Sequence, residues 1–478
     1  MMKESKQKVV VIGGGITGLV SAYSLQQEAR KQMLPIDVVL LEAGPRLGGK
    51  IQTIKRDGFI IEKGPESFLE SRASLVDLAK DLKIEQELVK DTSGTSFVLV
   101  RGKLYPIPGG AIKGIPTDLS PFITTGLFSL FGKLRAAADF FLPKSKESED
   151  QSLGHFFRRR LGDEVVENLI EPLLSEIYAG DIDQLSLQAT FPQVYEMEQT
   201  YGSLVRGMKK KESKRMKVDE KASFLTFKNG LQSFVERLEA SLNEGSVLKG
   251  SKATRVEKEN QRYAITINES FQLYADAVVV ALPHKAACTL FSNYAFLNPL
   301  KEMTSTSVAT VTVAFDEDAF DHGMEGSSFV ISRNSDYTIT ACTVSNRKWS
   351  HSAPAGKILL RCYVGRIHHE TIVDLSDEEI TKIVLEDLHR LMKIKKKPLF
   401  SVISRWKNAM PQYVVGHTER VKSVKQQFRE HLPGIVLCGS SFEGISMPDC
   451  IDQGENAAQE ILQYLQLKNN KDEVLVKQ

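Results

Sequence analysis

The feature that most constrains the fold of this chain is a glycine-rich turn near its start. Gly13-Gly14-Gly15-Ile16-Thr17-Gly18 follows the apolar run KVVVI and precedes a stretch, Ile16 to Glu28, that reads as a helix. In such a unit the first glycine permits the tight turn, Gly15 lets the backbone approach a pyrophosphate, and Gly18 lets the helix pack closely on the strand. The motif alone is weak evidence, but here it stands in the context that it requires. We therefore predict dinucleotide binding at this turn.

A carboxylate closes the next buried strand. The apolar run IDVVLL (residues 36–41) ends at Glu42, where an acidic residue of a dinucleotide-binding unit holds ribose hydroxyls. The separation between the motif and Glu42 is longer than the usual figure of about 20 residues. The polar insert EARKQMLP accounts for the extra length.

Two further glycine-rich segments favour FAD over NAD. After Glu42 the chain reads AGPRLGGK, so Arg46 and the pair Gly48-Gly49 add N–H groups and positive charge near the phosphates. This segment resembles the R-x-G-G signature of the amine-oxidase-like FAD superfamily, and a plain surface turn is the alternative. Residues 438–454 (CGSSFEGISMPDCIDQG) follow a strand, turn sharply and open a helix, which supplies a second helix N-terminus.

The composition is that of a globular protein with two or three domains. The chain has 478 residues, of which 42% are hydrophobic and 26% charged, and this length exceeds one compact core. A formal charge of +2, from 62 basic and 60 acidic residues, argues against nucleic-acid binding. Five cysteines without a C-x-x-C pair, together with the lack of a signal-peptide pattern, lead us to expect reduced thiols, no metal site and a cytoplasmic location.

The stretch Phe122–Leu142 is the candidate for membrane contact. Lys133, Arg135 and Asp139 interrupt it, so it falls short of the roughly 18 uncharged residues that spanning a bilayer requires. We interpret it as an amphipathic helix packed on its own protein. A helix that touches a membrane surface is the alternative.

The succession of patterns predicts an α/β fold with a discontinuous Rossmann-type FAD domain, a β-rich substrate domain and a helical insertion. We assign residues 1–75, 221–300 and 429–468 to the FAD domain, residues 76–100, 206–220 and 301–428 to the substrate domain, and residues 101–205 to the insertion. The β-signals of residues 305–365 indicate an antiparallel sheet. The charged run at 209–221 is predicted to be a solvated loop.

Over essentially its whole length the chain resembles the protoporphyrinogen/coproporphyrinogen oxidase family, most closely the soluble bacterial branch. The resemblance rests on VVVIGGGITGL (9–19), GGKIQT (48–53), EKGPESF (62–68), GDEVVENLIEPLLSEIYAGDIDQLS (162–186), PHKAA (283–287), RWKNAMPQYVVGH (405–417) and GSSFEGISMPDCIDQG (439–454). The YAGD and PQY…GH stretches are the most specific of these. One departure is Glu176, where the family pattern leads us to expect glycine; a carboxylate there could change how an anionic substrate is held.

The resemblance implies a set of FAD-contacting residues. Gly13, Gly14, Gly15, Ile16, Thr17, Gly18, Glu42, Ala43 and Lys50 would hold the ADP half, and Val256 would contact adenine through its backbone. The flavin would be lined by Gly64, Pro65, Glu66, Ser67, Trp406, Ile445, Ser446 and Met447. Trp406 as a core residue, rather than a cofactor wall, is the alternative.

Other polar residues receive no firm role from the sequence. We interpret His284 and His417 as turn or core histidines and Cys450 as a free thiol, and no catalytic residue can be named. Hydride removal by a flavin needs no acid–base dyad, because the cofactor supplies the difficult chemistry. The candidate partners of substrate carboxylates are Arg72, Arg206, Lys209, Arg333 and Arg347, with plain surface charge as the alternative for each.

The activity implied by the resemblance is oxidation of coproporphyrinogen III to coproporphyrin III by FAD, with molecular oxygen as acceptor and hydrogen peroxide as product, in haem biosynthesis. Protoporphyrinogen IX is the alternative substrate. A flavin amine oxidase or desaturase, and a carrier that has lost FAD, as in the Rab escort family, also stay open. The expected partners are the porphyrinogen and oxygen, and no transmembrane segment is expected. Peripheral contact with a membrane surface and contact with the next enzyme of the haem pathway stay open.

Overall fold

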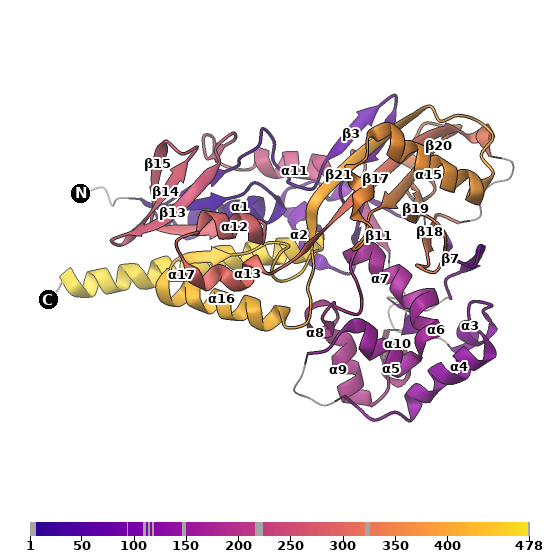
Figure 1. Ribbon diagram of the computed structural model, residues 1–478. Helices are drawn as coiled ribbons and strands as arrows, with labels where there is room; N and C mark the ends of the chain where they lie inside the picture. The colour runs from indigo at the N-terminus through magenta and orange to yellow at the C-terminus, as the bar shows by residue number, and fades with distance from the viewer. Residues whose placement is uncertain are drawn as a thin grey trace.

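A computed structural model of the chain describes residues 6–92, 94–108, 111–112, 115–116, 119–145, 150–215, 223–320 and 326–476, without the side chains of 111–121, 175–176, 211–215 and 469–476. Three assemblies make up the described fold: a parallel sheet with covering helices, a large mixed sheet, and a group of short helices (Figure 1). This mixed α/β architecture confirms the predicted fold class. The exact domain limits stay a prediction.

The parallel sheet is assembled from three distant parts of the chain. Its strand order is β12 (Val247–Leu248), β2 (Ile36–Leu41), β1 (Gln7–Ile12), β16 (Ala277–Val280) and β22 (Ile435–Leu437). All four strand pairs are parallel. Consecutive residues of β1 face opposite sides of the sheet, and both sides are covered by protein, so the buried part of the strand, Val9–Ile12, is continuously apolar rather than alternating.

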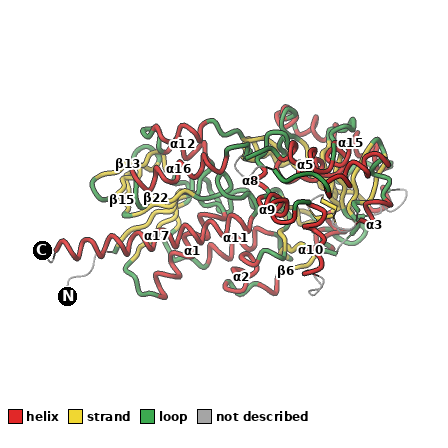
Figure 2. The backbone as a smooth tube through the Cα atoms, turned by 90° about the horizontal axis from the view of Figure 1, so that it is seen from below, coloured by secondary structure: helices red, strands yellow, loops and turns green. Residues whose placement is uncertain are grey.

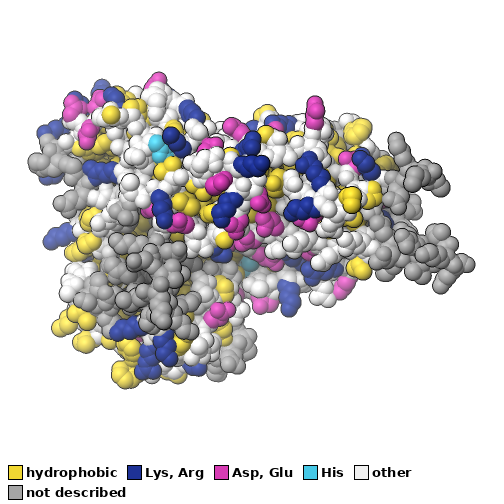
Figure 3. Space-filling view, turned by 180° about the vertical axis from the view of Figure 1, so that it is seen from behind, with side chains coloured by type: hydrophobic (Ala, Val, Ile, Leu, Met, Phe, Trp, Pro, Cys, Tyr) yellow, Lys and Arg dark blue, Asp and Glu magenta, His cyan; other side chains and the backbone are white. Residues whose placement is uncertain are grey.

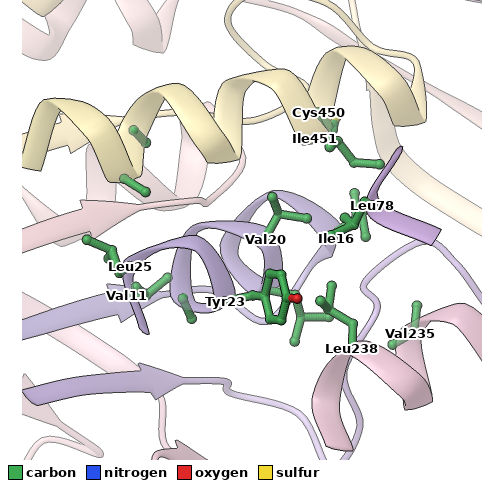
Figure 4. Close-up of a cluster of buried hydrophobic side chains, with 14 of the residues drawn as sticks. Val11, Ile16, Val20, Tyr23, Leu25, Leu78, Val235, Leu238, Cys450 and Ile451 are labelled. Atoms are coloured by element: carbon green, nitrogen blue, oxygen red, sulfur yellow. The ribbon is translucent and has the colours of Figure 1, made fainter. Parts of the chain in front are cut away.

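Helices cover one face of this sheet, and a second small sheet with further helices covers the other. On the first face lie α1 (Ile16–Lys31), α2 (Ala73–Asp81), α11 (Leu231–Ala240) and α17 (Met447–Val476). In the buried cluster of Figure 4, Val20 lies on the side of α1 that faces Ile451 of α17, and Tyr23 lies on the side toward Leu238 of α11. On the second face lie β13 (Ala253–Glu259), β14 (Arg262–Ile267), β15 (Phe271–Ala275), α12 (His284–Leu290), α13 (Asn298–Lys301) and α16 (His417–His431). Figure 2 shows α17 running along this layered body as one long helix.

The seven-stranded sheet lies beside the parallel one. Its order is β21 (Phe400–Pro411), β17 (Ser305–Asp316), β20 (Lys357–Val364), β19 (Ile339–Val344), β18 (Ser328–Ile331), β7 (Ser96–Val100) and β8 (Lys103–Pro106). The β18–β7 pair of this sheet is parallel and the other five pairs are antiparallel. The antiparallel sheet predicted for residues 305–365 is confirmed by the pairs β17–β20, β20–β19 and β19–β18. Helix α15 (Asp377–Met392) covers one face, and a capping box of Ser376 and Glu379 defines its start.

The helical part contains two departures from the sequence prediction. Residues 122–142 do not form one amphipathic helix: α3 (Leu119–Thr124), α4 (Leu130–Ala137) and a 3₁₀ turn (Ala138–Phe140) follow one another. Ser129 caps α4 by accepting the Gly132 N–H at 3.0 Å, which requires a break before it. The predicted loop at 209–221 is also partly wrong, because α10 (Leu204–Arg215) extends into it, whereas 216–222 lie outside the described residues.

The described residues contain neither a helix suited to a bilayer nor a cluster of metal-binding side chains. None of the helices described combines the length and apolarity needed to cross a bilayer. Nor do three or more His, Cys, Asp or Glu side chains in the described part of the chain converge as metal ligands would.

A buried ion network stabilises the helical part. Arg160 on α5 (Leu153–Leu161) donates to Glu198 Oε1 from Nε at 2.7 Å and to Asp139 Oδ1 from Nη1 at 3.2 Å. All three side chains are fully buried. Burial raises the pKa of Glu198, but hydrogen bonds from Ser145 and Arg160 outweigh it and hold that pKa below its usual value.

We predict that Glu198→Gln destabilises the protein by about 3–5 kcal/mol, because it leaves Arg160 buried with one charge partner fewer. The folded-state pKa of Glu198 is lowered. The stabilisation is therefore present above the unfolded-state value of about 4.3 and is lost as the pH falls through the folded value. Urea unfolding at several pH values measures both effects. The exposed neighbour Glu196→Gln is the control, and equal unfolding free energies for the two variants would contradict the prediction.

Candidate functional site

The first glycine-rich loop is held by backbone packing that excludes side chains at two positions. A Cβ on Gly13 would lie 2.5 Å from the carbonyl oxygen of Ala281, and one on Gly18 would lie 1.9 Å from that of Gly13. Gly13 also has φ +107°, which favours glycine. A Cβ on Gly15 would meet no protein atom within 4 Å. Gly15 therefore borders open space at the start of α1, whereas the other two glycines serve the fold.

The N-terminus of α1 faces that open space without a capping side chain. Gly15 is the N-cap residue, no side chain hydrogen-bonds there, and the first turn carries no acidic residue. The first N–H groups of a helix have no partner inside the helix and favour a negative charge. Ile16 and Thr17 thus belong to a ready anion-binding site. The open space and the free N–H groups fit the pyrophosphate of a dinucleotide.

Glu42 links the first loop to the second. Its Oε2 accepts the Gly14 N–H and its Oε1 accepts the Gly44 N–H, both at 2.7 Å. A carboxylate has about four acceptor positions, so two remain for hydroxyl groups after these bonds. A later part of the chain returns to Glu42, because the Ser251 N–H donates to the Glu42 carbonyl oxygen at 2.8 Å. Ser251 precedes β13, and this strand carries the buried Val256.

The second loop stacks on the first, and Arg46 braces it. Gly48 N–H donates to the Gly14 carbonyl at 2.8 Å, and a Cβ on Gly49 would lie 3.2 Å from Gly15 Cα. Arg46 donates to three carbonyls of its own loop, those of Leu47, Gly49 and Ile51. The sequence led us to expect the Arg46 charge near the phosphates; in the structure its hydrogen bonds within the described residues go to this loop. Ala43 is exposed beside it.

Lys50 reaches from this loop toward the C-terminal part of the chain. Its ammonium donates to the Ala409 carbonyl and lies 3.4 Å from Ser440 Oγ. Burial lowers the pKa of Lys50, while the nearby Cys450 acts in the opposite direction. Lys50 therefore lies between the two glycine-rich regions of the site.

The third segment, residues 63–67, passes tightly over Lys50. A Cβ on Gly64 would lie 1.7 Å from the Lys50 carbonyl oxygen, so only glycine fits there. Trp406 Nε1 donates to the Lys63 carbonyl at 2.9 Å, and Arg361 donates to the Gly64 carbonyl. Trp406 is half-buried and packs beside Gly64. Pro65 and Ser67 complete the turn, and Glu66 accepts a hydrogen bond from Ser345 at 2.9 Å.

The C-terminal loop is fixed by one tyrosine. Tyr413 donates its hydroxyl to the Ser440 carbonyl at 2.8 Å and accepts the Gly444 N–H at 3.0 Å. Ile445, the residue after Gly444, packs against the core of the helical part. The Ser446 hydroxyl donates to Asp449 at 2.6 Å, and Met447 is buried at the start of α17. A Cβ on Gly454 would lie 2.7 Å from the Thr17 carbonyl oxygen. The starts of α1 and α17 are thereby brought together.

The two histidines hold the C-terminal loop in place. His284 Nε2 donates to the Met303 carbonyl at 2.9 Å, and its Nδ1 lies 3.2 Å from Ser441 Oγ. His417 Nε2 donates to the Phe442 carbonyl at 2.8 Å, and its ring stacks on Tyr413 with centroids 3.9 Å apart. Burial lowers the pKa of both imidazoles and favours the neutral form. This is consistent with core histidines.

All five cysteines are buried and unpaired. Burial raises the pKa of Cys450 to about 11. A thiol of such a pKa is a poor nucleophile near neutral pH, which disfavours a covalent link between Cys450 and a cofactor.

The five cationic candidates lie in different places. Arg72 forms an ion pair with Asp449 at 3.0 Å. Arg206 and Lys209 are exposed on α10. Arg347 donates to the Gly326 carbonyl at 3.2 Å. Arg333 pairs with Glu171 and donates to the Gly180 carbonyl at 2.7 Å. The backbone of Glu176 belongs to α7 (Glu171–Tyr178), but its side chain lies outside the described residues.

Sequence reasoning missed two groups beside the 63–67 turn, namely Glu62 and Arg361. Arg361 is 3% exposed inside the apolar strand KILLRCYV, and a charged residue in such a run is the signal that could have revealed it. Glu62 ends β4 (Phe59–Glu62) and accepts the Leu231 N–H at 2.7 Å.

Comparison with known proteins identifies the family. The model of flavin-containing amine oxidoreductases matches residues 16–462. The chain is 51% identical to the coproporphyrinogen III oxidase of Bacillus subtilis (strain 168), over 97% of this chain and 100% of that protein. It is 43% identical to that of Staphylococcus aureus (strain NCTC 8325 / PS 47), over 96% and 100%. The chain belongs to the flavin-containing amine oxidoreductase family, in its porphyrinogen-oxidase branch.

A solved structure agrees with this membership. A candidate protoporphyrinogen oxidase from Exiguobacterium sp. 255-15 superposes with a TM-score of 0.85 at 37% identity, covering 97% of this chain and 99% of that one. The prediction of an FAD-dependent oxidoreductase is confirmed by the family. The roles of the individual site residues stay proposals.

We predict that Gly15→Val abolishes FAD binding without unfolding the protein. The new Cβ meets no protein atom but occupies the space assigned to the pyrophosphate. The matched control is Gly18→Val, whose Cβ would lie 1.9 Å from a backbone oxygen, so it should lose stability as well as flavin. Flavin absorbance and thermal unfolding separate the two effects. A yellow Gly15→Val protein would show that the loop is placed wrongly.

Proposed function

We propose that the glycine loops and Glu42 bind the ADP half of FAD non-covalently. The pyrophosphate lies over the start of α1 at Gly13–Gly18, the ribose hydroxyls bind Glu42 beside Ala43, and adenine lies against the backbone of Val256. The free helix N-terminus and the two unused acceptor positions of Glu42 support this placement.

The resemblance assigns Lys50 to the ADP half of FAD, and the same proposal places the flavin half beside it. Gly64–Ser67, Trp406 and Ile445–Met447 border one region, since Lys50 packs under Gly64 and approaches Ser440, and Gly64 lies beside Trp406. Tyr413 holds the Ser440–Gly444 loop at the opposite side of Lys50. When bound, FAD would supply the redox chemistry, namely hydride acceptance from a methylene carbon of the substrate and transfer of the electrons to oxygen to give hydrogen peroxide.

The substrate that we propose is coproporphyrinogen III, oxidised to coproporphyrin III in haem biosynthesis. The observation that carries this choice is the full-length similarity to two coproporphyrinogen III oxidases at 51% and 43% identity. Protoporphyrinogen IX remains the second candidate because the Exiguobacterium neighbour is described as acting on it. The two substrates differ in carboxylate number, four against two, so the cations around the site decide between them.

Two arginines supply a site for a substrate carboxylate. The charges of Arg333 and Glu171 both act on Arg366, and Arg333 forms an ion pair with Glu171. Burial, reinforced by Arg333, lowers the pKa of Arg366. Two guanidinium groups facing one carboxylate leave a positive charge, and a propionate would neutralise it. Arg333 also holds the Gly180 carbonyl, which ties this charge to the YAGD stretch.

An apolar surface on the helical part is the region that we assign to peripheral membrane contact. Figure 3 shows hydrophobic side chains gathered over the helical part at the lower left. Its exposed members are Ile123, Leu130, Phe131, Leu134 and Phe141. They belong to the stretch that the sequence had already singled out. The cytoplasmic location and a contact with the next haem-pathway enzyme stay predictions of the resemblance.

We predict that kcat/KM for coproporphyrinogen III exceeds that for protoporphyrinogen IX by about tenfold or more. Each charge-assisted hydrogen bond shielded from water contributes about 1.5–3 kcal/mol, and coproporphyrinogen offers two more carboxylates. Steady-state rates in detergent-free buffer and with lipid vesicles test this. Equal or higher efficiency with protoporphyrinogen in both conditions would transfer the activity to the second candidate. A preference for protoporphyrinogen only with lipid would instead assign the apolar surface a role in substrate delivery.

A further inference from the structure

A small polar cavity lies directly behind the 63–67 turn. It is bounded by β4, the Glu66 side chain, β20 and the segment Ser345–Ser352. The cavity leaves about 20 Å³ for the centre of a water molecule, and roughly 10–15 Å³ measured in this way is enough to hold one. The polar side chains that decide its chemistry are Glu62, Glu66, Trp349, His351, Ser352 and Arg361.

Buried polar atoms without a protein partner line this cavity. Arg361 Nε and Nη1, Trp349 Nε1 and Ser352 Oγ have no hydrogen bond within the described residues. The three side chains are at most 5% exposed. Buried donors and acceptors are nearly always hydrogen-bonded, to water where protein offers no partner. Four such atoms around one cavity mark a water-binding site.

The charges in the cavity do not cancel. Among the described residues that line the cavity, Arg361 is the single guanidinium, and it lies 3.8 Å from the Glu66 carboxylate while also donating to the Gly64 carbonyl. Glu62 is the second carboxylate, held by the Leu231 N–H at 2.7 Å and the Thr53 hydroxyl at 2.9 Å. Burial lowers the pKa of His351 and favours its neutral form. One proton on a carboxyl group would therefore make the cavity neutral.

Glu62 is the group suited to carry that proton. Burial raises its pKa to about 7, against the opposing effects of the Leu231 N–H, the Thr53 hydroxyl and Arg361, and Glu66 raises it further. The carboxyl of Glu62 can thus gain or lose a proton near neutral pH in response to a change of charge nearby. The Gly64 carbonyl, which Arg361 holds, belongs to the turn assigned to the flavin.

The proposed reaction releases a proton in one half-reaction and consumes a proton in the next. Each two-electron step removes a hydride from a methylene bridge of the porphyrinogen and a proton from a pyrrole nitrogen. Formation of hydrogen peroxide from oxygen consumes two electrons and two protons, one of them delivered with the hydride. The second proton is released in one half-reaction and consumed in the next, so it must be held or exchanged with solvent between them.

We propose that water in this cavity joins Arg361 to Glu62, and that Glu62 holds the proton released from the substrate until oxygen reduction consumes it. The proposal rests on the proposed function for the source of the proton. Its core statement, that Glu62 takes up a proton when the cofactor is reduced, does not need the substrate. The test can therefore be made on the holoenzyme without a porphyrinogen.

The first test is a redox titration of the flavin at pH values on both sides of neutrality. In the wild type the midpoint potential should depend on pH more steeply near neutrality than at pH values well above or below it, because reduction near neutrality brings one additional proton to Glu62. Glu62→Gln should lose this additional dependence while still binding flavin. Asp387→Asn is the matched control: Asp387 is a buried carboxylate on α15 that accepts two backbone N–H groups outside the cavity, so its removal should leave the dependence intact.

The second test needs no variant and so does not depend on the folding of Glu62→Gln. The reduced-minus-oxidised infrared spectrum of the wild type should gain the C=O band of a protonated carboxyl, with a shift in D₂O. The proposal is overturned if this band is absent, or if the flavin midpoint potential depends on pH in the same way in the wild type and in Glu62→Gln. Because neither test uses a porphyrinogen, a chain that fails to oxidise coproporphyrinogen refutes the proposed function without touching this result.

Discussion

Close backbone contact at glycines is the constraint on which the rest of this structure depends. Gly18 lies against Gly13, Gly64 against Lys50, and Gly454 against Thr17, and a Cβ at any of these three would lie 1.7–2.7 Å from a backbone oxygen. These contacts bring segments from the beginning, the next loop and the end of the chain into one place. A side chain at any of these positions would push apart the two segments in contact there, and at Gly454 these segments are the helices α1 and α17.

The electrostatics of the site follow from that packing. The uncapped start of α1 supplies positive potential, Glu42 supplies a carboxylate that is already oriented by two backbone N–H groups, and Lys50 crosses to the C-terminal loop. Because the Glu42 carboxylate is already oriented, less conformational entropy of the protein is lost when a ligand binds. The cavity behind Gly64 adds a group that responds to charge, since burial places the Glu62 pKa near neutrality. In our proposals, cofactor binding and proton storage therefore belong to adjoining parts of one framework.

Local patterns predicted the parts of the site that lie close together in sequence. The glycine motif, Glu42 and the apolar strands could be read because each signal spans a few residues. Groups that meet only through the fold could not: the Arg361 hydrogen bond to Gly64 joins residues 297 positions apart. Arg46 was expected near the phosphates because sequence shows charge but not the carbonyls it binds. The predicted helix at 122–142 was wrong because apolar periodicity continued across a capped break at Ser129.

The measurement that tests the central claim most directly is anaerobic mixing of the purified holoenzyme with coproporphyrinogen III. Our account predicts that the flavin absorbance bleaches in a single turnover, and that oxygen restores it with hydrogen peroxide and coproporphyrin III as products. Acid precipitation afterwards should release the flavin into solution, because the account has no covalent link. A flavin that stays oxidised with coproporphyrinogen III, but bleaches with protoporphyrinogen IX or an amine, would contradict the assignment.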